Sequence, residues 1–164
     1  MYTTEDQDFI RVLVADDDEH VLRCYREAFG GDEPSRHMQT LSDLAAELFD
    51  SDQEEVNTPR FDIVECNQGA DAIQRAMDAT EQGSPFDVII LDVRMPPGID
   101  GVEAGSEIRR IDPDVDIVFV TGYSDVPLDE LRRRVPPPMR LHYFNKPLSF
   151  TQLAEDVVTM VREH

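Results

Sequence analysis

Short apolar runs alternate with segments of helical period along most of the chain. Five runs rich in β-branched or aromatic residues have the length of buried strands; they cover 9–15, 60–66, 86–92, 115–121 and 140–145. Five other segments repeat apolar residues every three or four positions and predict helices over 19–29, 69–83, 101–111, 125–135 and 149–163. Glycine or proline follows most of these helices, as expected at helix ends.

The regular alternation of strand and helix predicts an α/β fold of the type (βα)5. Because the strands are apolar on both faces, we expect a parallel sheet with helices on both sides. Right-handed crossovers favour a flavodoxin-like, doubly wound sheet with strand order 2-1-3-4-5. With 164 residues, the chain is expected to form one domain over 1–164.

The segment 31–60 interrupts the passage from the first helix to the second strand. Its apolar residues recur at helical spacing and predict an extra inserted helix over about 40–50, with Thr40 as a candidate N-cap. This insert has two interpretations. It either pads the edge of the fold or offers an apolar stripe for docking or dimerisation.

Polar side chains follow four of the five predicted strands. These residues are Asp16, Asp17 and Asp18 after the first strand, Asp92 after the third, Thr121 after the fourth and Lys146 after the fifth. In the order 2-1-3-4-5 these four strands are neighbours. Their carboxyl ends would therefore meet at the edge of the sheet where doubly wound folds bind ligands.

The grouping of these side chains suggests phosphate chemistry. Carboxylates packed closely repel one another unless a cation is bound, and an all-oxygen site suits Mg²⁺. Lys146 and Thr121 could then hold phosphoryl oxygens, while an aspartate acts as nucleophile. Lys146 is the only lysine among 15 basic residues, so its position indicates a need for one compact charge. Each residue also has a simpler explanation. The three aspartates after the first strand could form a solvated loop, Asp92 could cap a helix, and the hydroxyl of Thr121 could bond the backbone at a strand end.

Composition excludes several classes of protein. The chain has 35 acidic and 15 basic residues, a formal charge of −20, so we expect no direct binding of nucleic acid or anionic membranes. The sequence shows neither a signal peptide nor an apolar run long enough to span a membrane. Cys24 and Cys66 lack metal-binding spacing and are expected to be reduced packing residues of a cytoplasmic protein.

Four segments carry a resemblance to a known family. RVLVADDDEH, DVIILDVRMPPGIDGVE, VFVTGYSD and YFNKPLSFTQL resemble, in order, the signature segments of CheY-like receiver domains of response regulators. These domains serve two-component phosphorelay signal transduction. The resemblance covers the chain except residues 1–8 and the insert. The loop RMPPGIDG resembles a receiver subtype found in hybrid kinases and cyclic-dinucleotide signalling proteins.

This resemblance implies a phosphoprotein that forms an aspartyl phosphate and is not an enzyme with a substrate of its own. Asp92 would accept the phosphoryl group from a phosphohistidine. Asp16 and Asp17, with Asp92 and the backbone carbonyl of Arg94, would hold Mg²⁺. Asp17 with Asp18 is the alternative acidic pair; the first pair is preferred because it directly follows the apolar strand.

The resemblance also implies a switch. Lys146 would pair with Asp92 at rest and with a phosphoryl oxygen afterwards, and its bond to Pro147 is typically cis in this family. Thr121 would shift to bond the phosphoryl group, and Tyr143 would swing inward behind it. The new phosphate contacts would bias a two-state element. The alternative for Tyr143 is an aromatic residue on the outer face of a strand.

The implied partners are a sensor histidine kinase or a histidine phosphotransfer protein, and a downstream protein or fused output domain. A homodimer is also compatible with the sequence, as is either a stand-alone regulator or a module of a longer protein. The stretch LRRRVPPPMR adds a basic patch that either meets partners or complements a helix dipole.

Two other functions compete with a working receiver. One is a degenerate, phosphorylation-independent receiver that serves as an interaction module; the full set of site residues argues against it. The other is a Mg²⁺-dependent aspartyl-phosphate phosphatase of the haloacid-dehalogenase type. In that class the nucleophile follows the first strand and the acidic pair comes last. Here the acidic pair comes first, which favours the receiver.

Overall fold

The structure, a computed structural model, describes residues 9–30, 60–122 and 126–163. Within these ranges a parallel sheet has the strand order β2-β1-β3-β4-β5. Its strands are β1 (Phe9–Ala15), β2 (Arg60–Cys66), β3 (Val88–Asp92), β4 (Asp116–Thr121) and β5 (Leu141–Asn145). The helices are α1 (Glu19–Ala28), α3 (Gly69–Glu81), α4 (Gly101–Ile111), α5 (Leu128–Arg134) and α6 (Phe150–Arg162), with a 3-10 turn η1 (Pro138–Arg140). The predicted doubly wound fold is confirmed.

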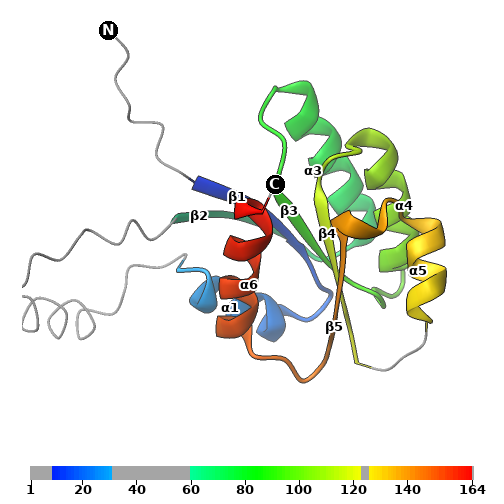
Figure 1. Ribbon diagram of the computed structural model, residues 1–164. Helices are drawn as coiled ribbons and strands as arrows, with labels where there is room; N and C mark the ends of the chain where they lie inside the picture. The colour runs from blue at the N-terminus through cyan, green and yellow to red at the C-terminus, as the bar shows by residue number, and fades with distance from the viewer. Residues whose placement is uncertain (1–8, 31–59, 123–125, 164) are drawn as a thin grey trace, which may run out of the picture.

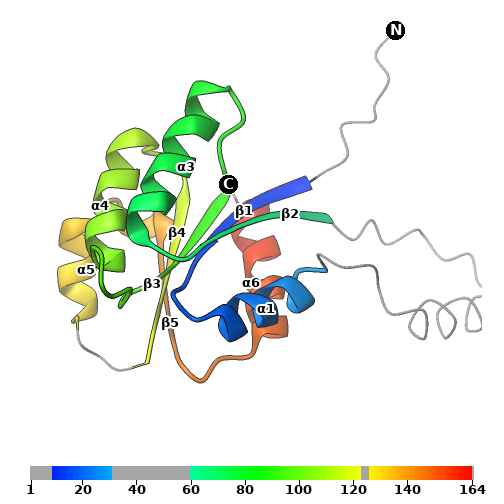
Figure 2. The same ribbon diagram turned by 180° about the vertical axis from the view of Figure 1, so that it is seen from behind.

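Helices cover both faces of the sheet. α1 and α6 lie on one face, and α3, α4 and α5 lie on the other (Figures 1 and 2). Because side chains alternate along a strand, each strand contributes to two separate cores. In β1, Leu13 packs into the core under α3 and α4, while Val12 and Val14 pack into the core under α1 and α6.

The helix ends follow local rules. Asp18, Asp100 and Ser149 each cap the helix that follows them by accepting a bond from a backbone N–H. α1 and α3 are followed by Gly30 and Gly83, both with φ of 73°, a conformation that favours glycine. The sequence therefore carries its own stop and start signals.

Two predicted elements begin two or three residues later in the structure, and the helix predicted over 69–83 ends at Glu81. The third strand begins at Val88 rather than at residue 86. Asp87, just before it, bonds Arg11 twice: its backbone N–H donates to the carbonyl of Arg11, and its carboxylate accepts from the backbone N–H of Arg11. The helix predicted over 125–135 begins at Leu128, and Pro127 stands before it with an extended backbone. The predicted insert helix over 40–50 and its cap Thr40 lie outside the described residues.

The two cysteines have different surroundings and no disulfide. Cys24 is partly exposed on α1, whereas Cys66 is buried at the end of β2. Burial raises the pKa of the Cys66 thiol to about 11, so this thiol stays protonated and serves as a packing group. In the part of the chain that the structure describes, every helix is too short or too polar to cross a bilayer.

Candidate functional site

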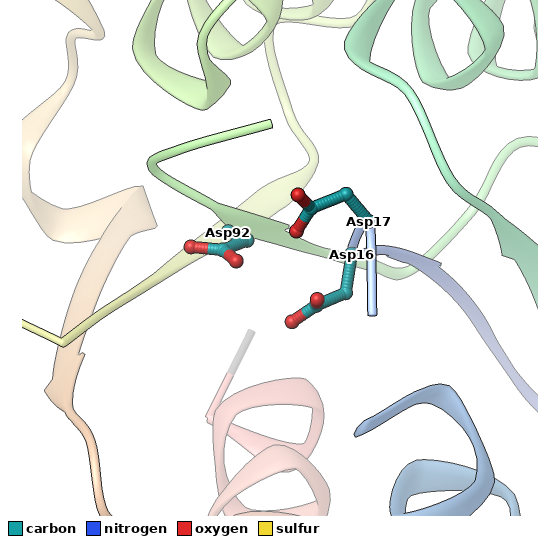
Figure 3. A group of neighbouring side chains, drawn as sticks. All are labelled: Asp16, Asp17 and Asp92. Atoms are coloured by element: carbon teal, nitrogen blue, oxygen red, sulfur yellow. The ribbon is translucent and has the colours of Figure 1, made fainter. Parts of the chain in front are cut away.

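Three carboxylates meet at the carboxyl ends of β1 and β3. These strands pair in parallel with Ala15 opposite Leu91, which brings the residues that follow each of them to the same edge. Asp16, Asp17 and Asp92 each offer one oxygen, and these oxygens lie within 4.8 Å of one another (Figure 3). Asp16 is 1% exposed and Asp92 8%, while Asp17 faces solvent. The acidic cluster, defined as these three residues, is therefore open on the Asp17 side.

The turn after β1 separates the roles of its three aspartates. The side chain of Asp18 accepts a bond of 2.9 Å from the backbone N–H of His20 and caps α1. The carboxylate of Asp16 accepts a bond of 2.9 Å from the backbone N–H of Asp18, which holds the turn. This geometry joins Asp16 and Asp17 to Asp92, as in the preferred interpretation, and leaves Asp18 to the helix.

Lys146 reaches the acidic cluster from β5. Its Nζ lies 3.2 Å from Oδ2 of Asp92 and 3.5 Å from Oδ2 of Asp16. β4 separates β5 from β3 in the sheet, so the side chain must extend past the end of β4. The backbone N–H of Lys146 donates a bond of 2.7 Å to the carbonyl of Thr121, which fixes its starting point. The bond between Lys146 and Pro147 is cis, as the family resemblance implied.

The electrostatics of the cluster show an excess of negative charge. Burial, together with the neighbouring charge of Asp92, raises the pKa of Asp16 to about 6, although the N–H of Asp18 and the ammonium of Lys146 act in the opposite direction. Burial alone would lower the pKa of Lys146, but the two carboxylates outweigh it and raise that pKa. Lys146 therefore stays charged, yet one ammonium does not balance three carboxylates.

The loop between β3 and α4 folds back on Asp92. Arg94 donates its backbone N–H to Oδ1 of Asp92 at 3.3 Å. The N–H of Gly101 donates to the carbonyl of Val93 at 2.8 Å and closes the loop. A side chain on Gly101 would collide with the carbonyl of Asp92, so this position requires glycine. The peptide at Arg94 is thus held beside the acidic cluster.

Thr121 and Tyr143 lie on the strands that flank this edge. Thr121 is 3% exposed at the end of β4 and stands opposite Asn145. Tyr143 on β5 stands opposite Phe119 on β4, and its side chain is partly buried against the core under α4 and α5. Tyr143 is therefore packed on the inner side of the edge strand. It belongs to the same pair of strands that carries Thr121 and Lys146.

Sequence reasoning missed one residue beside this site, Gln68. It stands at the N-cap of α3, and its side-chain amide bonds the carbonyl of Pro96 in the loop after Asp92. The available signal was a long amide side chain at a position where short polar residues are preferred.

The donors of the acidic cluster fit a hard divalent cation. All are carboxylate oxygens from rigid strand ends, which is the chemistry that Mg²⁺ prefers over nitrogen or sulfur ligands. The exposed side at Asp17 leaves room for water or a phosphate oxygen, because Mg²⁺ usually keeps part of its hydration shell.

Comparison with known proteins bears on this arrangement. The family model of the response regulator receiver domain matches residues 53–157. That match contains Asp92, Thr121 and Lys146 but begins after β1. The placement of Asp16 and Asp17 therefore comes from the tertiary structure.

Three similar proteins illustrate the likeness. The sensor kinase CckA of Brucella abortus is 30% identical over 97 residues, which cover 59% of this chain but only 10% of that kinase. The response regulator receiver protein CpdR of the same organism is 28% identical over 101 residues, covering 62% of this chain and 77% of CpdR. The solved structure of the response regulator TrrA of Thermotoga maritima, in complex with Mg²⁺-BeF, is 26% identical with a TM-score of 0.57, covering 92% of this chain and 97% of TrrA.

The fold, the strand-end residues and the family match agree with one another. The strand order and the position of Asp92 after β3 are the ones that the alternation of strands and helices predicted, and the four signature segments point to the same family. We conclude that this chain belongs to the response regulator receiver domain family of two-component signalling.

Proposed function

We propose that this chain is a working phosphoacceptor domain in which Asp92 takes a phosphoryl group from a phosphohistidine. The donor is a sensor histidine kinase or a histidine phosphotransfer protein. The observation that carries this proposal is the contact of 3.2 Å between Oδ2 of Asp92 and Nζ of Lys146, within a cluster of three carboxylates. Asp92, the ammonium of Lys146 and the acidic pair share one edge of the sheet, which supports their roles as nucleophile, cation for phosphoryl oxygens and metal ligands.

The transfer needs little from the protein beyond positioning. A carboxylate oxygen of Asp92 forms a bond to phosphorus, while the P–N bond of the phosphohistidine breaks and the imidazole nitrogen keeps the electron pair. Asp16 and Asp17, with Asp92 and the backbone carbonyl of Arg94, would hold Mg²⁺, which neutralises charge on the phosphoryl oxygens. Lys146 exchanges its bond with Asp92 for a bond with a phosphoryl oxygen.

The output follows from a change at the neighbouring strands. The hydroxyl of Thr121 moves to a phosphoryl oxygen, and Tyr143 moves further into the space behind it. Support comes from the partial burial of Tyr143 and from the bond of 2.7 Å that links Lys146 to Thr121. The altered surface around β5 then meets a downstream protein or an output domain.

Intact mass measurement tests the proposal. Wild type and Asp92→Asn would each be incubated with acetyl phosphate, with Mg²⁺ and after removal of divalent metals by a chelator. We expect one added phosphoryl group in wild type with Mg²⁺ and none in Asp92→Asn. Asp129→Asn is the matched control, because this aspartate has a 90% exposed side chain on α5 and should leave the adduct unchanged.

Two outcomes would contradict the proposal. An adduct that persists in Asp92→Asn would place the phosphoacceptor elsewhere. A folded wild-type protein that takes no phosphoryl group from acetyl phosphate or from a phosphorylated histidine phosphotransfer domain would leave the degenerate interaction module as the better function.

A further inference from the structure

The turn between β2 and α3 touches the loop that follows Asp92. Nε2 of Gln68 donates a bond of 3.3 Å to the carbonyl of Pro96. Oε1 of the same amide lies so close to Gly98 that a Cβ there would approach it to 2.6 Å. Next to it, a Cβ on Gly69 would lie 2.9 Å from the side chain of Ile99. Two adjacent residues of the turn therefore fit against one stretch of the loop.

Gln68 occupies a position where another residue type would serve its own helix better. It is the N-cap of α3, with φ of −141° and ψ of 150°, and its side chain makes no capping bond. Short polar residues such as Asn are preferred at this position, because they accept a bond from the first turn. By contrast, α1, α4 and α6 are all capped by their own side chains. The side chain of Gln68 bonds the neighbouring loop in place of its own helix.

The contacted loop carries the backbone that the site depends on. It leaves β3 at Asp92 and passes the exposed Arg94, whose N–H bonds the Asp92 carboxylate at 3.3 Å. Met95 anchors it in the core with 1% exposure. Past Met95, residues 96–98 are exposed, and the Gln68 amide bonds this stretch to the body of the protein.

We infer that Gln68 is a positioning residue for the phosphoacceptor loop. Its amide holds the carbonyl of Pro96 and thereby limits the motion of the peptide at Arg94 beside the acidic cluster. Loss of the amide would loosen residues 94–100, weaken Mg²⁺ binding and slow phosphorylation without removing any reacting group. The part of this inference that concerns Mg²⁺ and phosphorylation rests on the proposed function, whereas the restraint on the loop does not.

Hydrogen exchange of the metal-free protein tests the restraint directly. In Gln68→Ala, amides of peptides covering 93–101 should exchange several-fold faster than in wild type, while those of β3 and α4 keep their rates. Gln74→Ala is the matched control. Its amide bonds Asp78 within α3 at 2.9 Å, so the same substitution on the same helix should leave the loop unchanged.

Gln68→Asn separates a positioning role from a merely structural one. The shorter amide can cap α3 but cannot reach Pro96, so we expect stability at least equal to wild type together with a loosened loop. Isothermal titration with Mg²⁺ should show several-fold to about tenfold weaker binding in both Gln68 variants and no change in Gln74→Ala.

Two results would overturn this inference. One is wild-type exchange of residues 93–101 in both Gln68 variants. The other is faster exchange of this loop in Gln68→Ala together with wild-type exchange rates in Gln68→Asn. That result would mean that Gln68 acts only as a weak helix cap. Failure of the proposed function looks different, because a wild type that takes no phosphoryl group would still show the loop effect in the metal-free protein.

Discussion

Two buried aspartates at opposite ends of the sheet have similar exposure and opposite surroundings. Asp16 follows β1 at the carboxyl edge and is 1% exposed, and Asp116 begins β4 at the other edge and is 2% exposed. Asp116 has two partners of its own, Nε2 of His142 at 3.1 Å and Nη1 of Arg140 at 3.4 Å. Asp16 shares the single ammonium of Lys146 with Asp92.

The surroundings of Asp116 are held together by hydrogen bonds from arginine. Nearby, Arg109 is 6% exposed and donates to the backbone carbonyls of Pro113 and Val115, and to that of Arg140 at 3.0 Å. These bonds tie α4, β4 and the start of β5 together. Asp116 is therefore expected to stabilise the fold, because both of its carboxylate oxygens have a partner, Nε2 of His142 and Nη1 of Arg140.

The comparison teaches that burial alone does not distinguish a structural carboxylate from a functional one. The balance of local charge does. Asp116 is paired with the guanidinium of Arg140 and bonded to His142, and Arg109 lies nearby, whereas at the Asp16 end three carboxylates face one ammonium. The second arrangement is expected to cost stability in the metal-free protein and would be relieved by a bound cation, as expected of a site rather than a structural network.

The largest predicted effect on stability is that of Asp116→Ala. Removing this carboxylate leaves Arg140 and His142 partly buried without their partner, so the free energy of unfolding should fall by about 3 kcal/mol. Urea denaturation at pH 7 measures it. The control is Asp129→Ala, which breaks an exposed pair of 3.7 Å with Arg132 and should change stability by less than about 0.5 kcal/mol. If Asp116→Ala lost no more unfolding free energy than the control, Asp116 would not be the structural carboxylate that its contrast with Asp16 requires.

Asp16→Asn is predicted to raise the stability of the metal-free protein, the opposite of the effect of Asp116→Ala. Without Mg²⁺ at pH 8, the substitution removes a buried charge that lies close to Asp92, and the free energy of unfolding should rise by on the order of 2 kcal/mol. Thermal or urea unfolding in the presence of a chelator measures this gain. Added Mg²⁺ should stabilise wild type in proportion to its binding and stabilise the variant much less. A metal-free variant less stable than wild type would contradict the charge excess.

The pH dependence of the stability difference between Asp16→Asn and wild type is a sharper test. The pKa of Asp16 is about 6 in the folded protein, above its ordinary value of 3.8. The folded state therefore binds the proton on Asp16 more tightly than the unfolded state does. The stability that this proton contributes is fully present below about pH 4 and is lost as pH rises through 6. The gain of Asp16→Asn over wild type should thus be near zero at pH 4 and complete by pH 7. A gain that is constant across this range would assign it to another cause.

The smallest predicted effect is that of Glu107→Ala on α4. Glu107 pairs with Arg110 at 2.7 Å, but the side chains are 46% and 76% exposed. The change in unfolding free energy should stay below about 0.5 kcal/mol and shrink further at high salt. A larger effect would mean that exposed charge pairs contribute more to stability than their exposure suggests. It would also weaken the contrast between the surroundings of Asp16 and those of Asp116.

The sequence alone predicted much of this protein because the relevant signals are local. Hydrophobic period and glycine or proline stops defined the strands and helices, and handedness rules gave the strand order. The predicted elements and strand order together placed five residues at neighbouring strand ends: Asp16, Asp17, Asp92, Thr121 and Lys146.

Other features depended on residues far apart in the chain, so only the tertiary structure decided them. The sequence could not tell whether Asp18 would cap α1 or join the acidic cluster, because that depends on how the turn faces β3. It grouped Arg140 with the arginines of α5, but Arg140 turns to Asp116 on β4 while Arg132, Arg133 and Arg134 face solvent. Likewise, the contact of Gln68 with Pro96 arises only when β2 and β3 lie on either side of β1. A local pattern can assign an element, but the charge balance around a buried group is set by whichever neighbours the fold brings to it.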